Sequence, residues 1–111
     1  MLRIVPATAS ERKIVLSQEP PVGNHRPAVN VMFDSASRFG KDLVSVIMTG
    51  MGADGCEGMK KIKATGGYSI AQDENTCVVY GMPKAVVDAG LADEVRPLDK
   101  IAEAIVEAVR R

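Results

Sequence analysis

A glycine-rich turn that carries a carboxylate stands near the middle of the chain, at Gly50-Met51-Gly52-Ala53-Asp54-Gly55. A G-x-G-x-x-G turn between a strand and a helix is typical of dinucleotide binding, and Asp73 and Glu74 follow about 20 residues later, where a ribose-binding acid is expected. Asp54 argues against this interpretation, because its charge would repel a pyrophosphate at the helix N-terminus.

Asp54 has two further interpretations. With Glu57 it fits a capping box, in which the aspartate caps the helix that follows and contributes about 1 kcal/mol without any other function. The same carboxylate could also be the orienting acid of a Ser-His-Asp arrangement, where it holds the imidazole and stabilises the imidazolium. The residue types alone leave all three interpretations open.

Four segments of the chain together resemble the bacterial chemotaxis protein-glutamate methylesterases of the CheB type. Their order and intervals also suit that family, and the likeness spans nearly the whole chain. The four segments are His25-Arg26-Pro27-Ala28-Val29, Thr49-Gly50-Met51-Gly52-Ala53-Asp54-Gly55, Ile70-Ala71-Gln72-Asp73-Glu74 and Val79-Tyr80-Gly81-Met82-Pro83.

This resemblance implies an esterase domain that hydrolyses methyl esters of glutamate on chemoreceptor helices and deamidates certain receptor glutamines, with no metal and no cofactor. A serine attacks the ester carbonyl, a histidine moves the proton and an aspartate orients the histidine. Asp54 matches that aspartate, and Gly50, Met51 and Gly52 are expected to line the site beside the reacting carbonyl.

Two expected family segments are absent: the G-x-S-x-G-G turn of the nucleophile and the A-P-G-x-x-H segment of the histidine. The match begins at about Met1, so we expect residues 1–111 to be the C-terminal portion of a catalytic domain. The part that bears the nucleophile, and the receiver domain that usually precedes it, would then lie outside this chain. We therefore predict that the chain alone has no esterase activity. The alternative is a non-catalytic or nucleotide-binding module that uses the turn from Gly50 to Gly55.

His25 and Cys56 are the remaining residues whose types could do chemistry. His25 is the only histidine, but the family motif places it in the loop before a helix, so we expect it to bond to backbone or to line a substrate groove. Cys56 stands at a predicted helix N-terminus, which would favour its thiolate, but no partner base is evident, so a buried structural thiol is the preferred interpretation.

The pattern of apolar residues predicts an α/β fold with a doubly wound, mostly parallel, Rossmann-like sheet, helices on both faces and an N-terminal hairpin. The run Leu43–Thr49 indicates a strand buried on both faces, which would lose cover on one side if earlier strands are missing. In such sheets the site lies at the carboxyl ends of the strands, where the turn 50–55 is expected. The predicted strands are 2–5, 13–16, 43–49, 68–71 and 93–96, and the predicted helices are 27–40, 56–65, 83–89 and one that begins near residue 97.

Fourteen basic and fourteen acidic residues give a formal net charge of zero. This balance argues against nucleic acid or an anionic membrane as the main partner. No run approaches the ~18 apolar residues of a membrane-spanning helix, and residues 1–6 do not fit the pattern expected of a secretory signal. Cys56 and Cys77 are expected to be free thiols of a cytoplasmic protein. The partners implied by the resemblance are methylated chemoreceptor helices and the protein's own receiver domain.

Overall fold

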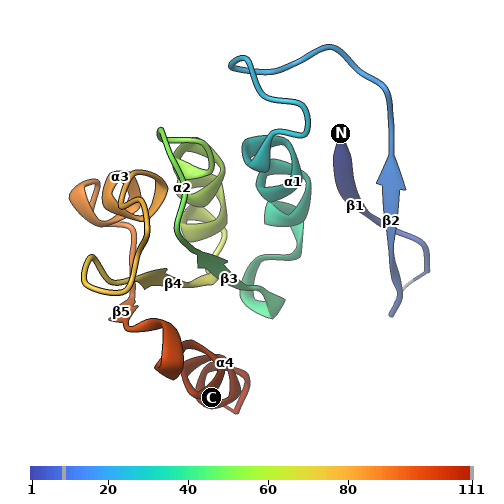
Figure 1. Cartoon of the computed structure of the whole chain (residues 1–111). Coiled ribbons are helices and arrows are strands. Elements are labelled where there is room, and N and C mark those ends of the chain that lie inside the picture. The colour runs from blue at the N-terminus through green and yellow to red at the C-terminus, as the bar shows by residue number, and fades with distance from the viewer. Residues whose placement is uncertain (9, 111) are drawn as a thin grey trace.

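The structure is a computed structural model that describes residues 1–8 and 10–110. Ala9, in the predicted first turn, and Arg111, at the end of the predicted domain portion, lie outside the described residues. The helices and strands are, in chain order, β1 (Leu2–Pro6), β2 (Arg12–Leu16), α1 (Val29–Ala36), β3 (Val44–Ile47), α2 (Cys56–Ala64), β4 (Tyr68–Gln72), α3 (Met82–Asp88), β5 (Glu94–Arg96) and α4 (Ile101–Val109) (Figure 1). Turns of 3₁₀ helix precede β3 and α4, over Ser37–Asp42 and Leu98–Lys100.

A three-stranded parallel sheet lies at the centre of the fold, in the order β3-β4-β5. Val44 lies opposite Tyr68 and Ile70 lies opposite Glu94. The chain crosses from β3 to β4 through α2 and from β4 to β5 through α3, which is the βαβ connection that parallel strands require. The predicted α/β class with a parallel sheet is confirmed.

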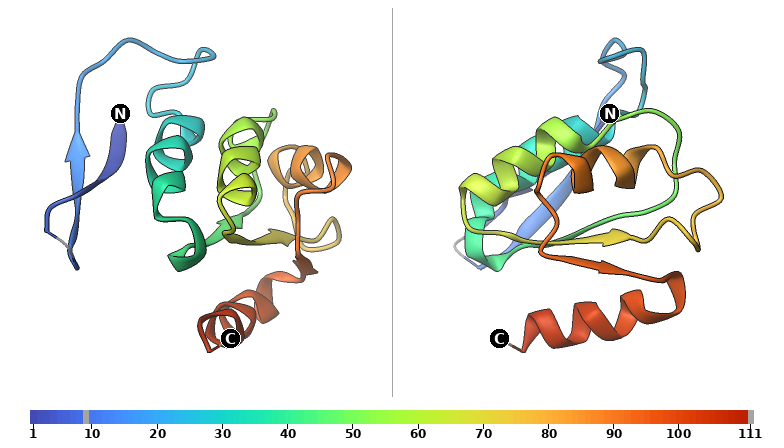
Figure 2. Two further views of the ribbon diagram at one scale, coloured as in Figure 1. Left: turned by 180° about the vertical axis from the view of Figure 1, so that it is seen from behind. Right: turned by 90° about the vertical axis from the view of Figure 1, so that its left-hand side faces the viewer.

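Helices cover both faces of this sheet. Helices α1, α2 and α3 lie side by side on one face, and α4 lies on the other (Figure 2). The main apolar core lies on the side of the three helices and consists of Phe33, Ile47, Met59, Ile62, Ala71 and Val86. On the opposite face α4 packs against β3 and β4 and buries Ile101 and Ala104.

The N-terminal hairpin forms as predicted, with β1 and β2 antiparallel and Leu2 opposite Leu16. It packs against α1 on the side away from α2 (Figure 1). The backbone N–H of Ile4 donates to Ser35 Oγ on α1 at 2.8 Å, which anchors the hairpin to that helix.

Helix α1 is shorter than the predicted range Pro27–Gly40. Ala28, its N-cap, has an extended backbone, and the regular helix ends at Ala36. At that end the Ser37 hydroxyl donates to the carbonyl of Asp34 at 2.7 Å, and a 3₁₀ turn follows. A side chain that bonds to a carbonyl three residues earlier competes with continuation of the α-helix.

One edge of the sheet is open: within residues 1–8 and 10–110, β3 pairs with β4 alone. Ser45 and Ile47 are buried, whereas Val44 and Val46 are half-buried. The predicted burial on both faces therefore holds for only one face of this strand. A groove of about 240 Å³ runs along this edge, and its apolar lining includes Ile4, Met32, Phe33, Leu43, Val44 and Val46.

Candidate functional site

The turn 50–55 follows β3 at the carboxyl end of the parallel sheet. Asp54 is half-buried there, and both of its carboxylate oxygens accept backbone hydrogen bonds from the first turn of α1. Oδ2 accepts from the N–H of Val29 at 2.7 Å, and Oδ1 accepts from the N–H of Asn30 at 3.0 Å. The N-terminus of a helix carries unpaired N–H groups and a partial positive charge, so it holds a carboxylate well. The Asp54 side chain is thereby fixed in one orientation.

The side chain of Asn30, on α1, bonds in turn to the start of α2. Its side-chain Oδ1 accepts from the N–H of Gly55 at 3.0 Å and from the N–H of Gly58 at 2.8 Å. Asp54, in the turn before α2, therefore caps α1, and Asn30, on α1, caps α2. We call these four hydrogen bonds the cross-cap.

The cross-cap corrects the capping-box interpretation of Asp54. The N-cap of α2 is Gly55, whose φ of 99° is left-handed and which makes no side-chain cap bond. Glu57 points to Lys60 in an exposed ion pair at 2.9 Å. Asp54 is a capping residue, but it caps a helix that begins 25 residues earlier. A Cβ at Gly55 would lie 2.8 Å from Ile47 Cδ1, so this position needs glycine both for its φ and for space.

The segment 79–83, one of the four that resemble the family, lies directly against the turn. The N–H of Gly50 donates to the carbonyl of Val79 at 3.0 Å, and the carbonyl of Gly50 accepts from Gly81 and Met82 at 3.1 and 2.9 Å. The Thr49 hydroxyl also accepts from the N–H of Val79 at 2.9 Å. The segment 79–82 therefore holds the backbone at Gly50 in place.

Gln72, at the end of β4, bonds to the residue that comes directly before the turn. Its side chain is 1% exposed, and its Oε1 accepts from the N–H of Thr49 at 2.9 Å. Its Nε2 donates to the carbonyl of Thr76 at 2.9 Å. Asp73 closes the same loop by accepting from the N–H of Thr76 at 3.0 Å.

All four resembling segments thus contribute to one end of the sheet. Sequence reasoning named Asp54 and the turn but missed Asn30 and Gln72 as residues that position it. A polar side chain at the end of an apolar strand was the available signal for Gln72. Asn30 gave no comparable signal, because an asparagine in the first turn of a helix is common at the surface.

Of the four residues predicted to line the site, Gly50 is half-buried and the other three are exposed. Met51 is 81% exposed, and Gly52 and His25 are also at the surface. His25 lies in a tight turn, in which its N–H and carbonyl bond to the backbone of Val22 at 3.0 Å. In residues 1–8 and 10–110 it makes no hydrogen bond with Asp54.

Cys56 and Cys77 are both free and half-buried. The Cys56 thiol donates to the carbonyl of Ala85 at 3.6 Å, which directs it towards α3 rather than towards Asp54. Burial raises the pKa of Cys77, and the nearby charge of Asp73 raises it further. The raised pKa disfavours the Cys77 thiolate as a nucleophile.

The structure offers no support for a phosphate at the turn 50–55. The N–H groups of Gly55 and Gly58, which a pyrophosphate would use at the start of α2, already donate to Asn30. Within the described part of the chain, no three His, Cys, Asp or Glu side chains gather as a metal site would require. No helix among the same residues is long and apolar enough to cross a membrane.

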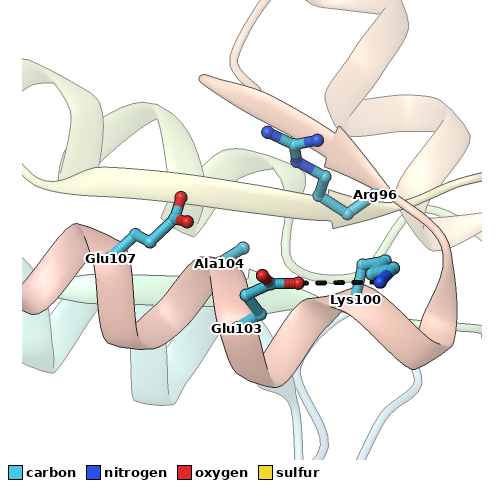
Figure 3. Close-up of a pocket in the computed structure, with 5 residues that line it drawn as sticks. All are labelled: Arg96, Lys100, Glu103, Ala104 and Glu107. Atoms are coloured by element: carbon cyan, nitrogen blue, oxygen red, sulfur yellow. Dashed lines mark ion pairs between the residues drawn. The ribbon is translucent and has the colours of Figure 1, made fainter.

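A separate pocket of about 220 Å³ lies between β5 and α4 and is lined by Arg96, Lys100, Glu103, Ala104 and Glu107 (Figure 3). Its charges are largely paired within the protein: Arg96 contacts Glu94 at 2.8 Å and Lys100 contacts Glu103 at 3.8 Å. The hydrogen bond that Arg96 donates to Glu94 raises the pKa of Arg96. Because its positive and negative charges balance, the pocket favours neither an anionic nor a cationic ligand. It contains none of the predicted site residues.

The fold and the turn together define an α/β protein in which an aspartate, bonded to the N-terminus of α1, lies at the carboxyl end of the parallel strand β3. The chain belongs to the CheB methylesterase family, whose sequence model matches residues 2–105. A relative from Desulfitobacterium hafniense, named protein-glutamate methylesterase/protein-glutamine glutaminase, is 51% identical over 96% of this chain. A relative of the same name from Symbiobacterium thermophilum is 52% identical over 90% of this chain.

The crystal structure of the Thermotoga maritima CheB methylesterase catalytic domain is also similar, with a TM-score of 0.88 and 42% identity. The match covers 96% of this chain and 56% of that domain. The chain spans only 28% of the length of the two named relatives. It therefore corresponds to part of a catalytic domain.

Proposed function

We propose that this chain is the C-terminal portion of a methylesterase catalytic domain and supplies Asp54 as the orienting acid of a Ser-His-Asp site. The observation that carries the proposal is the Asp54 carboxylate, which two N–H groups of α1 hold at the carboxyl end of β3. A carboxylate has about four lone-pair positions, so two remain for an imidazole N–H after both bonds to α1.

The nucleophilic serine and the histidine would come from the part of the catalytic domain that precedes the matched region. The open edge of β3 and its apolar groove support this division, because a strand added there would end beside Asp54. The complete domain would then be the doubly wound, Rossmann-like sheet that the sequence predicts.

The proposed reaction is hydrolysis of glutamate methyl esters on the cytoplasmic helices of chemoreceptors. The serine forms an ester with the glutamyl carbonyl as methanol leaves, and water then releases the glutamate and the serine. Ammonia leaves instead when the substrate is a glutamine amide. The histidine moves the proton in each step, and Asp54 stabilises the imidazolium. Gly50, Met51, Gly52 and His25 are proposed to line the site, and a receiver domain in the whole protein is the proposed regulatory partner.

A chimaera tests this proposal. The part of the Thermotoga maritima catalytic domain that precedes the matched region is joined to residues 1–111, and methanol release from a methylated chemoreceptor fragment is measured. Asp54→Asn should lower kcat by about 10⁴-fold with little change in KM. Asp99→Asn, which changes an exposed acid at the other side of the sheet, is the matched control and should leave kcat unchanged.

The 111-residue chain alone supplies a second test. It should hydrolyse p-nitrophenyl acetate no faster than its Asp54→Ala variant. Turnover by the unmodified chain alone would show that this chain does not need a serine and a histidine from the preceding part. An Asp54→Asn chimaera that keeps its rate while folding normally would show that the assignment of Asp54 is wrong.

A further inference from the structure

We propose that Asn30 is a positioning residue for Asp54. Through the cross-cap it determines where the Asp54 carboxylate stands. This inference rests on the proposed function and names a residue that the Ser-His-Asp scheme does not include.

Asn30 contacts both the Asp54 carboxylate and the residue that follows Asp54. Its backbone N–H donates to Asp54 Oδ1 at 3.0 Å, and its side-chain Oδ1 accepts from the N–H of Gly55 at 3.0 Å. The carboxylate and the next peptide of the chain are thus both held by one residue. Removal of the side-chain carbonyl would leave the carboxylate bonded but release the backbone that carries it.

The close approach of α1 and α2 makes this arrangement possible. The two helices lie side by side with their N-terminal ends adjacent (Figure 1). Phe33 on α1 and Met59 and Ile62 on α2 are buried in one core, so the helix pair does not depend on Asn30 for its packing. Loss of the amide should therefore displace the turn without separating the helices.

The atom of Asn30 that the turn uses is the acceptor oxygen of its side chain. It caps α2 as an acceptor, while the Asp54 carboxylate bonds to the N-terminus of α1. An aspartate at position 30 would keep an oxygen at the place of Oδ1 and could still accept from Gly55 and Gly58. The positioning role therefore requires an acceptor of this length, rather than an amide as such.

The methylesterase chimaera described above, measured by methanol release, tests the proposal. Asn30→Ala should lower kcat by about 10²-fold, the loss associated with a misplacement of about 1 Å, while KM stays within about two-fold. Asn30→Asp should restore kcat to within a few-fold of the parent. Ser37→Ala removes a hydrogen bond at the other end of α1 and should leave kcat unchanged. Amide hydrogen exchange at Gly55 and Gly58 should accelerate in Asn30→Ala and not in Ser37→Ala.

The outcomes separate this proposal from the proposed function. An Asn30→Ala chimaera that melts earlier but keeps the parent kcat, or an Asn30→Asp chimaera as slow as Asn30→Ala, overturns the positioning role. If Asn30→Ala does not fold, Asn30→Ser is used, since it keeps a polar cap but is too short to reach both N–H groups; an unchanged kcat there also overturns the role. Failure of the proposed function is seen separately, as an Asp54→Asn chimaera with an unchanged rate.

Discussion

The backbone of Gly81 lies directly against the carbonyl of Gly50. The N–H of Gly81 donates to that oxygen at 3.1 Å, and a Cβ at position 81 would lie 2.7 Å from it. The same Cβ would lie 2.9 Å from the nitrogen of Gly52. Gly50 and Gly81, 31 residues apart in the chain, are thus in backbone contact, and position 81 has no room for a side chain.

Gly81→Ala should therefore displace the turn that carries Asp54. Overpacking of this kind costs about 1–3 kcal/mol, and the backbone at Gly50 would have to move because the contacts are main-chain atoms. Urea unfolding of the 111-residue chain measures the loss. Ala102→Ser adds one atom to the exposed face of α4 and should change the free energy of unfolding by less than about 0.5 kcal/mol. Equal midpoints for the two variants would contradict the close contact.

Gln72→Leu should destabilise the chain by about 1–3 kcal/mol, because the N–H of Thr49 would lose its acceptor. Gln72→Glu keeps the shape of the side chain but replaces the amide N–H donor with a carboxyl group. Only the protonated acid can donate to the carbonyl of Thr76, so this variant should be close to the parent at pH 4 and markedly less stable at pH 8. Thermal melts at the two pH values measure the effect. A Gln72→Glu variant with the same stability loss at both would show that the donated bond contributes nothing.

Met59→Ala should cost about 2–5 kcal/mol, since Met59 is fully buried between the sheet and α1 and the cavity can close only in part. Val109→Ala is the matched control: Val109 is 70% exposed on α4, and its loss should change little. Both are measured by urea unfolding. Similar midpoints for these variants would mean that α2 is not packed on the sheet in solution.

The Arg3–Glu19 pair predicts acid sensitivity of the hairpin. The hydrogen bond from Arg3, assisted by one from Ser17, lowers the pKa of Glu19 from 4.5 to about 2. A carboxylate with a lowered pKa stabilises the fold above its unfolded pKa and loses this contribution as the pH falls from about 4.5 towards 2. Glu19→Gln should therefore flatten the dependence of the melting temperature on pH in that range. An unchanged slope would show that the pair does not persist in solution.

Local signals were enough to predict much of the fold. The apolar, β-branched run before Gly50 predicted β3, and the glycines after Thr65 predicted the end of α2, because strand burial and helix termination depend on neighbouring residues. The predicted range 27–40 was too long for α1, since the bond from Ser37 to Asp34 and the 3₁₀ turn depend on local competition that the apolar spacing does not reveal.

The sequence by itself determined the alternation of strands and helices, the turn after β3 and the position of Asp54 within it. Only the tertiary structure decided which helix Asp54 caps. From the sequence the nearest N–H groups are those of α2, but packing brings the start of α1 close enough for Val29 and Asn30 to donate instead. It also decided that Gln72 faces Thr49 rather than solvent. These partners lie more than 20 residues apart in the chain, so no local pattern could pair them, and only the packing of the helices and strands selects them.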